Sequence, residues 1–202
     1  TPALFFANSG FEFNGFPSAG SWVSYGLGCE SETLPAFVVL GDKRGGPNGG
    51  ASNWTSGFLP SQHQGEELRT GKTPVRDLFP AIDQQEGSDK AARTFLKRLN
   101  TLHADRNGLD SILSNRMRSY ELAARMQLSV PQVSNIKGEP EHIKQMYGLN
   151  ESRTEDTGRR CLLARRLLEG GVRFVQIYSG GPIGGSPRAS WDAHENVKEN
   201  HS

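Results

Sequence analysis

A run of nearly all apolar residues at positions 34–40, LPAFVVL, constrains the fold of this chain more than any other segment. A strand with one face in water usually alternates apolar and polar residues, and this run does not. Continuous apolar runs are typical of parallel strands that are covered on both faces. The segment therefore predicts a buried strand inside a parallel sheet.

A second strand is predicted at residues 172–178, VRFVQIY, and a third at residues 2–7. Most of the chain between residues 40 and 172 carries helical patterns, so the two best strands are joined by a long helical crossover. Strands that alternate with helices indicate an α/β fold with a mainly parallel sheet flanked by helices. We expect residues 34–40 and 172–178 to be interior strands of the same sheet.

The helices are predicted from apolar residues that recur every three or four positions. One begins at Ser88, and a second spans residues 109–128 and ends before Pro131, with a loop over residues 129–140. A short helix is expected at residues 141–147. The last is opened by the capping-box pattern of residues 152–155 and is ended by Gly170 and Gly171.

Composition excludes several function classes. The chain has 23 Lys and Arg against 22 Asp and Glu, a formal net charge of +1, which gives no reason to expect nucleic acid as a partner. No apolar stretch approaches the roughly 18 residues that a membrane-spanning helix needs.

The 202 residues suit one domain, and a start at Thr1 within a predicted strand suggests a domain truncated at both ends. Cys29 and Cys161 match no metal or redox spacing, so we expect two free thiols.

The main chemical signal is the segment Trp191-Asp192-Ala193-His194, with His201 close behind. Asp192 and His194 follow a predicted strand and a glycine-rich loop, and ligands of open α/β sheets bind beyond the carboxyl ends of strands. A carboxylate and an imidazole together suit zinc, manganese or iron. The alternative from the residues alone is a surface Asp and His in a polar loop.

Other candidates have plainer interpretations. We expect His63, His103 and His142 to be structural or solvent-facing, and the arginine-rich residues 159–166 to be a solvated helix face. The glycine-rich residues 41–50 permit close approach of a ligand, but their plainer interpretation is a surface loop.

Several motifs resemble an uncharacterised family of exported bacterial proteins, domain-of-unknown-function family 1501, which is grouped with sulfatases and alkaline phosphatases. The matching segments recur in order along nearly the whole chain: residues 21–28, 34–40, 44–47, 54–60, 161–167, 171–176 and 191–194.

The resemblance implies an alkaline-phosphatase-like fold, of which this chain is an incomplete domain, and a metal-dependent hydrolase of sulfate or phosphate esters. It implies Asp192 and His194 as ligands of a divalent metal ion (zinc, manganese or calcium). His201 would contact these ligands rather than the metal. The family's nucleophile segment would precede residue 1, so no catalytic nucleophile is assigned. It further implies export to the periplasm or beyond and a small-molecule or polysaccharide ester as substrate. The alternative is a non-catalytic exported protein that uses the same fold to bind a polysaccharide or a protein partner.

Overall fold

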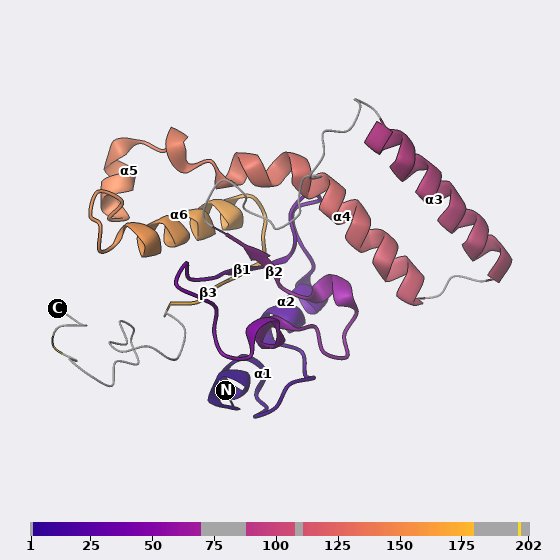
Figure 1. Cartoon of the computed structure of the whole chain (residues 1–202), viewed down its shortest axis with the longest axis horizontal. Coiled ribbons are helices and arrows are strands. Elements are labelled where there is room, and N and C mark those ends of the chain that lie inside the picture. Colours follow the sequence, from indigo (N-terminus) through magenta and orange to yellow (C-terminus); the bar gives the residue numbers. More distant parts are fainter. Residues whose placement is uncertain (1, 70–87, 108–110, 180–197, 199–202) are drawn as a thin grey trace.

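The computed structural model describes residues 2–69, 88–107, 111–179 and 198. It is a mixed α/β structure built on a small parallel sheet (Figure 1). In chain order the elements are α1 (Pro2–Ser9), α2 (Ala19–Leu27), β1 (Phe37–Leu40), η1 (Gly50–Trp54), η2 (Ser61–His63), β2 (Glu66–Leu68), α3 (Ser88–Asn107), α4 (Ser111–Ser134), η3 (Ile136–Gly138), α5 (Glu141–Met146), α6 (Glu155–Glu169) and β3 (Phe174–Ile177).

The sheet has the strand order β2-β1-β3, and both pairings are parallel. Strand β1 is the centre, with Phe37 in register with Phe174 and Val38 in register with Glu66. All four residues of β1 are buried, as its continuous apolar sequence predicts. The parallel α/β architecture expected from the sequence is therefore confirmed at this level.

Strand β3 differs from the prediction of an interior strand. Among the described residues it pairs only with β1, and it is half-buried with an exposed end at Ile177. Its sequence contains Gln176, a polar residue that suits a partly buried position better than a fully buried one.

Two apolar clusters cover the two faces of the sheet. On one face, Val38 and Leu40 pack with residues of α4 and α6, including Met126, Val130 and Leu163. On the other face, Phe37 and Val39 pack with Trp54, Phe174 and Tyr178. Alternate residues of β1 thus point to opposite faces, and both faces are covered. Figure 1 shows α4 and α6 on one side of the strands and α1 and α2 on the other.

The N-terminal segment is a helix, which corrects the predicted strand at residues 2–7. Pro2 fits the first turn of a helix, where its missing N–H costs nothing. Asn8 Nδ2 donates to the Leu4 carbonyl at 2.8 Å, and Ser9 Oγ donates to the Phe5 carbonyl at 2.8 Å. A short apolar run does not distinguish a strand from a helix by its period, and these local bonds favour the helix.

Helix α4 runs through Pro131 to Ser134, whereas the sequence predicts an end before the proline and a loop from residue 129. Proline removes one helical hydrogen bond. Burial offsets this loss, because Met126 and Val130 lie in the core on α4 and Val133 packs against it. No helix among the described residues has the length and apolar character to cross a membrane.

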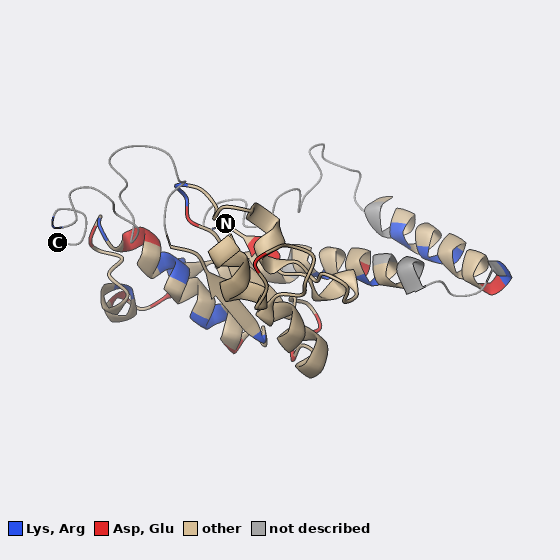
Figure 2. Cartoon of the chain, turned by 90° about the horizontal axis from the view of Figure 1, so that it is seen from below, with Lys and Arg blue, Asp and Glu red and all other residues tan. Residues whose placement is uncertain are grey.

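Helix α3 forms as predicted, but its apolar stripe is not buried. Phe95, Leu96, Leu99 and Leu102 are exposed, although Leu96 lines a cavity shared with α4. Polar contacts also join α3 to α4. Lys97 Nζ lies 3.4 Å from Glu121 Oε1, and Arg93 Nη1 donates to Gln127 Oε1 at 3.4 Å. In Figure 2, α3 and the part of α4 nearest to it form an arm away from the sheet, and Lys and Arg residues lie along α3.

Helix α6 begins and ends near the predicted residues, although its cap differs. The N-cap Thr154 makes no side-chain bond to the helix backbone, and its hydroxyl donates to the Gly148 carbonyl at 2.7 Å. Gly171 adopts a φ of 95°, the left-handed conformation that glycine tolerates after a helix. Cys29 and Cys161 are free thiols, as expected.

Candidate functional site

The residues predicted to bind metal, Asp192 and His194, lie outside the described part of the chain, as does His201. Strand β3, after which they follow in sequence, is present and ends at Ile177. Within residues 2–69, 88–107 and 111–179, no group of three or more His, Cys, Asp or Glu side chains could hold a metal ion. The described residues therefore include the carboxyl ends of the strands, where the metal site is predicted. The metal ligands themselves stay a prediction.

Asp42 lies at the centre of the polar groups at these strand ends, two residues after the end of β1. Its side chain is fully buried and is held in a tight turn, in which Gly45 N donates to the Asp42 carbonyl at 3.1 Å. Arg44 binds the carboxylate with two parallel contacts, Nε to Oδ1 at 3.0 Å and Nη2 to Oδ2 at 2.7 Å. This two-point geometry is the strongest form of arginine–carboxylate pairing. Hydrogen bonding to Asp42 raises the pKa of Arg44, although its partial burial acts in the opposite direction.

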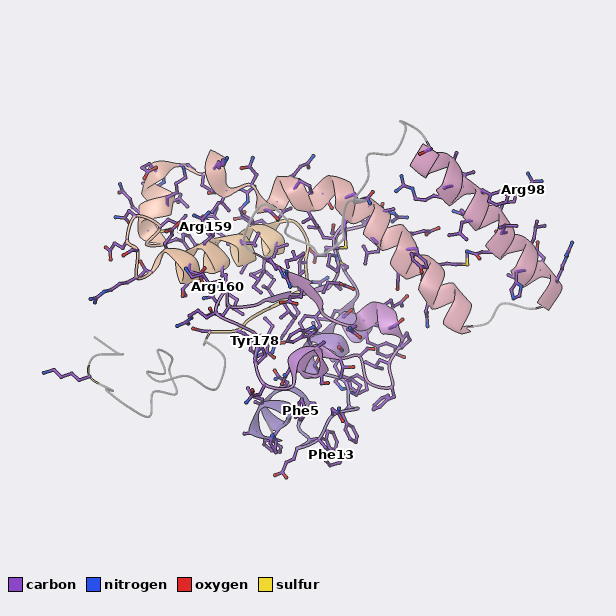
Figure 3. All side chains as sticks on the ribbon, in the orientation of Figure 1. Phe5, Phe13, Arg98, Arg159, Arg160 and Tyr178 are labelled. Atoms are coloured by element: carbon purple, nitrogen blue, oxygen red, sulfur yellow. The ribbon has the colours of Figure 1, made fainter. Side chains whose placement is uncertain are left out.

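Arg160 of α6 contacts the same carboxylate. Its side chain is only 1% exposed, and its Nη2 lies 3.4 Å from Asp42 Oδ2 and 3.0 Å from Asp156 Oδ2. Its Nη1 donates to the Tyr178 carbonyl, directly after β3 (Figure 3). A single guanidinium therefore joins α6 and the ends of β1 and β3.

The sequence interpretation of residues 159–166 as a solvated face is wrong for Arg160. Arg160 lies three, four and seven residues before Leu163, Ala164 and Leu167, all of which are buried. This spacing places it on the apolar face of α6. The periodicity could have identified it, but only a buried acidic partner makes such a position acceptable for arginine.

The charges of this cluster nearly balance. Lys43, Arg44 and Arg160 face Asp42 and Asp156, and Lys43 Nζ lies 3.7 Å from Asp156 Oδ1. The Glu67 carboxylate lies beside Gly41 at the same edge, so three cations and three carboxylates meet here. Two arginines bind the Asp42 carboxylate, so it does not fit the role of a metal ligand. A metal at this edge would need donors from residues such as Asp192 and His194.

A neutral polar cluster lies beside the charged one. Gln176 Nε2 donates to Asn8 Oδ1 at 2.5 Å and to the Tyr178 hydroxyl at 2.8 Å, and Asn8 Nδ2 donates to Asn53 Oδ1 at 3.2 Å. Asn53 donates in turn to the Asn48 carbonyl at 2.8 Å. Burial raises the pKa of Tyr178 to about 12, so its hydroxyl stays protonated. These bonds fix α1 and the glycine-rich loop of residues 41–50 against the end of β3.

The other histidines have ordinary surroundings or different contacts. His103 lies on exposed α3 and His142 on exposed α5. His63 is half-buried and contacts Ser24, away from the strand ends described above.

Comparison with known proteins identifies the family and nothing finer. One family model, described as a protein of unknown function (DUF1501), matches residues 1–202. No curated protein and no solved structure matches the chain. Because the match covers the whole chain, this protein belongs to the DUF1501 family.

Proposed function

We propose that the chain is part of an exported, metal-dependent hydrolase of sulfate or phosphate esters with an alkaline-phosphatase-like fold. The observation that carries this proposal is the buried contact of Arg160 with Asp42 and with the Tyr178 carbonyl. It fixes the carboxyl end of β3, and the segment with Asp192 and His194 follows that end in sequence. The carboxyl ends of parallel strands are where open α/β sheets bind their ligands.

The donor chemistry of this segment fits a divalent metal ion. Asp192 supplies a charged oxygen and His194 a neutral nitrogen, which suit zinc or manganese, whereas calcium prefers more oxygen ligands. His201 would hydrogen bond to a ligand rather than bind the metal. A bound ion would polarise the ester oxygen of the substrate.

Metal content of the full-length protein tests this proposal. We expect about one or two divalent ions per chain, of which at least one is lost when Asp192 and His194 are both replaced by Ala. His103→Ala with Asp105→Ala is the matched control, because it removes the same residue types at the same spacing from exposed α3. Hydrolysis of p-nitrophenyl sulfate and p-nitrophenyl phosphate should fall in the first variant and persist in the control. Equal metal content in the wild type and the first variant would remove both residues from the site.

A second candidate, binding of a polysaccharide without catalysis, is favoured by an exposed aromatic surface. We define this surface as the rings of Phe11, Phe13, Phe16, Trp22, Tyr25 and Phe58. Successive rings are in contact: Phe11 stacks on Phe16 with centroids 3.7 Å apart, and Phe58 lies 5.8 Å from Trp22. Residues 2–29 contain a single charged residue, Glu12, so the surface suits a neutral sugar chain.

Affinity electrophoresis in gels that contain a neutral glucan separates the two candidates. Binding should weaken when Trp22 and Phe58 are both replaced by Ala. Phe95→Ala is the control, since Phe95 is 64% exposed and Phe58 is 67% exposed. A protein that binds the glucan but has neither metal nor esterase activity would favour the second candidate over the hydrolase.

A further inference from the structure

A cavity of about 640 Å³ lies at the amino ends of the strands, opposite to the Asp42 cluster. Residues 34–36, which directly precede β1, and Glu66, the first residue of β2, form part of its wall. Helices α2, α3 and α4, the short helix η2 and the loop after α2 supply the rest. This volume is within the range of cavities that bind small molecules.

Four polar side chains in the cavity wall form one hydrogen-bonded chain. Arg118 Nη1 donates to Gln62 Oε1 at 3.3 Å, and Gln62 Nε2 lies 3.1 Å from His63 Nε2. His63 Nδ1 lies 2.9 Å from the hydroxyl of Ser24, which is nine-tenths or more buried at 2% exposure. The chain joins α4, η2 and α2.

The direction of donation in this chain follows from its first bond. Arginine has no acceptor, so Gln62 must present its oxygen to Arg118 and its NH₂ group to His63. His63 Nε2 is then the acceptor, and Nδ1 carries the proton that is donated to Ser24. Burial lowers the pKa of His63, which agrees with a neutral ring. Ser24 accepts this bond and can donate its own hydroxyl hydrogen.

The charged groups of the wall favour an anion. Arg93 and Arg118 line the cavity together with one carboxylate, that of Glu66. The rest of the lining is largely apolar and includes Leu34 and Met126, which are 3% and 4% exposed. A ligand would thus meet both cationic and hydroxyl donors and a hydrophobic surface.

We propose that this cavity binds an organic anion with an apolar body, such as a medium-chain carboxylate. Arg118 would pair with the carboxylate and Ser24 would donate a hydrogen bond to it, while Leu34, Leu122 and Met126 would contact the hydrocarbon. This proposal is independent of the esterase proposal, because it uses residues at the other ends of the strands.

Isothermal titration calorimetry of the full-length protein with octanoate tests the proposal. Octanoate should bind saturably, whereas acetate, which has only the head group, and 1-octanol, which has only the body, should each bind about tenfold or more weakly. Arg118→Met should weaken octanoate binding by about tenfold and leave 1-octanol binding unchanged. Arg98→Met is the matched control, because Arg98 lies on α3 outside the cavity wall (Figure 3).

Ser24→Ala removes the buried hydroxyl that would donate to the carboxylate. Circular dichroism checks that this variant folds. Arg118 is exposed, so its variant should fold and keeps the test decisive even if Ser24→Ala does not. Weaker octanoate binding in Arg118→Met but not in Arg98→Met supports the site. Absence of saturable binding, equal affinity for octanoate and 1-octanol, or unchanged affinity in Arg118→Met would each overturn it.

Discussion

Arg160 and Asp42, 118 positions apart in the sequence, form a buried ion pair in which Nη2 lies 3.4 Å from Oδ2. The exposed fractions of the two side chains are 1% and 0%. Asp42 follows the central strand and Arg160 reaches it from α6, so the pair connects the sheet to a covering helix. The same guanidinium holds the end of β3 through the Tyr178 carbonyl.

Replacing Arg160 by Met should lower the free energy of unfolding by about 3 kcal/mol, because it leaves buried polar groups without their partner. Arg159→Met is the control. Arg159, next to Arg160 in the sequence, is partly exposed, and its Nη2 lies 2.7 Å from Glu155 Oε1. Such a surface ion pair contributes less than about 1 kcal/mol. Urea unfolding of both variants measures the difference. Similar losses in the two variants would show that the buried network does not stabilise the fold.

Replacing Gly20 by Ala should destabilise the chain by about 1–3 kcal/mol through overpacking. A Cβ at this position would lie 2.5 Å from Cζ of the buried Phe37 ring. Gly26→Ala on the same helix is the control, because its Cβ would meet no atom within 4 Å. Alanine favours a helix over glycine, so the control should be neutral or stabilising by up to about 1 kcal/mol. Thermal unfolding would contradict the packing of α2 on β1 if both variants behaved alike.

Phe174→Ala should cost less than Phe37→Ala. The two rings meet edge to face with centroids 5.3 Å apart, but Phe37 is 1% exposed and Phe174 is only half-buried. We expect a loss of about 3–5 kcal/mol for Phe37 and about 2 kcal/mol for Phe174. Chemical denaturation measures both. A larger loss at Phe174 would indicate that β3 is covered more completely than the described residues show.

His63 should make the stability of the chain depend on pH. Burial lowers its pKa in the folded state below the ordinary value of 6.5, so the unfolded chain binds the proton more tightly. Its contribution is fully present above pH 6.5 and is lost as the pH falls through the folded pKa. Protonation would also place an N–H of His63 against the NH₂ group of Gln62.

His63→Gln should therefore flatten the fall in unfolding free energy between about pH 7 and pH 5. His142→Gln, at an exposed position of α5, is the control and should leave the pH profile of the wild type unchanged. Urea midpoints across this pH range measure the effect. An unchanged slope in His63→Gln would show that His63 does not titrate below its ordinary range.

The sequence by itself determined the parts of this protein whose signals are local. The apolar run of β1 and the helical periods of α3, α5 and α6 predict those elements because strand and helix place side chains at fixed intervals. The family motifs likewise predicted membership in DUF1501, and the family match confirms it. Asp192 and His194 stay a prediction from motif and chain order, since the described residues do not include them.

Only the tertiary structure decided the features that depend on distant partners. Strand β2, with the sequence EEL, has one apolar residue, Leu68, which is too few to show a period, and it forms by pairing its backbone with β1. Helix α4 passes Pro131 because Val130 is buried in the core. Arg160 is buried because Asp42, from another element, compensates its charge. Each of these features depends on contacts between distant residues that form only when the chain folds. Local patterns in the sequence do not show which distant residues will meet.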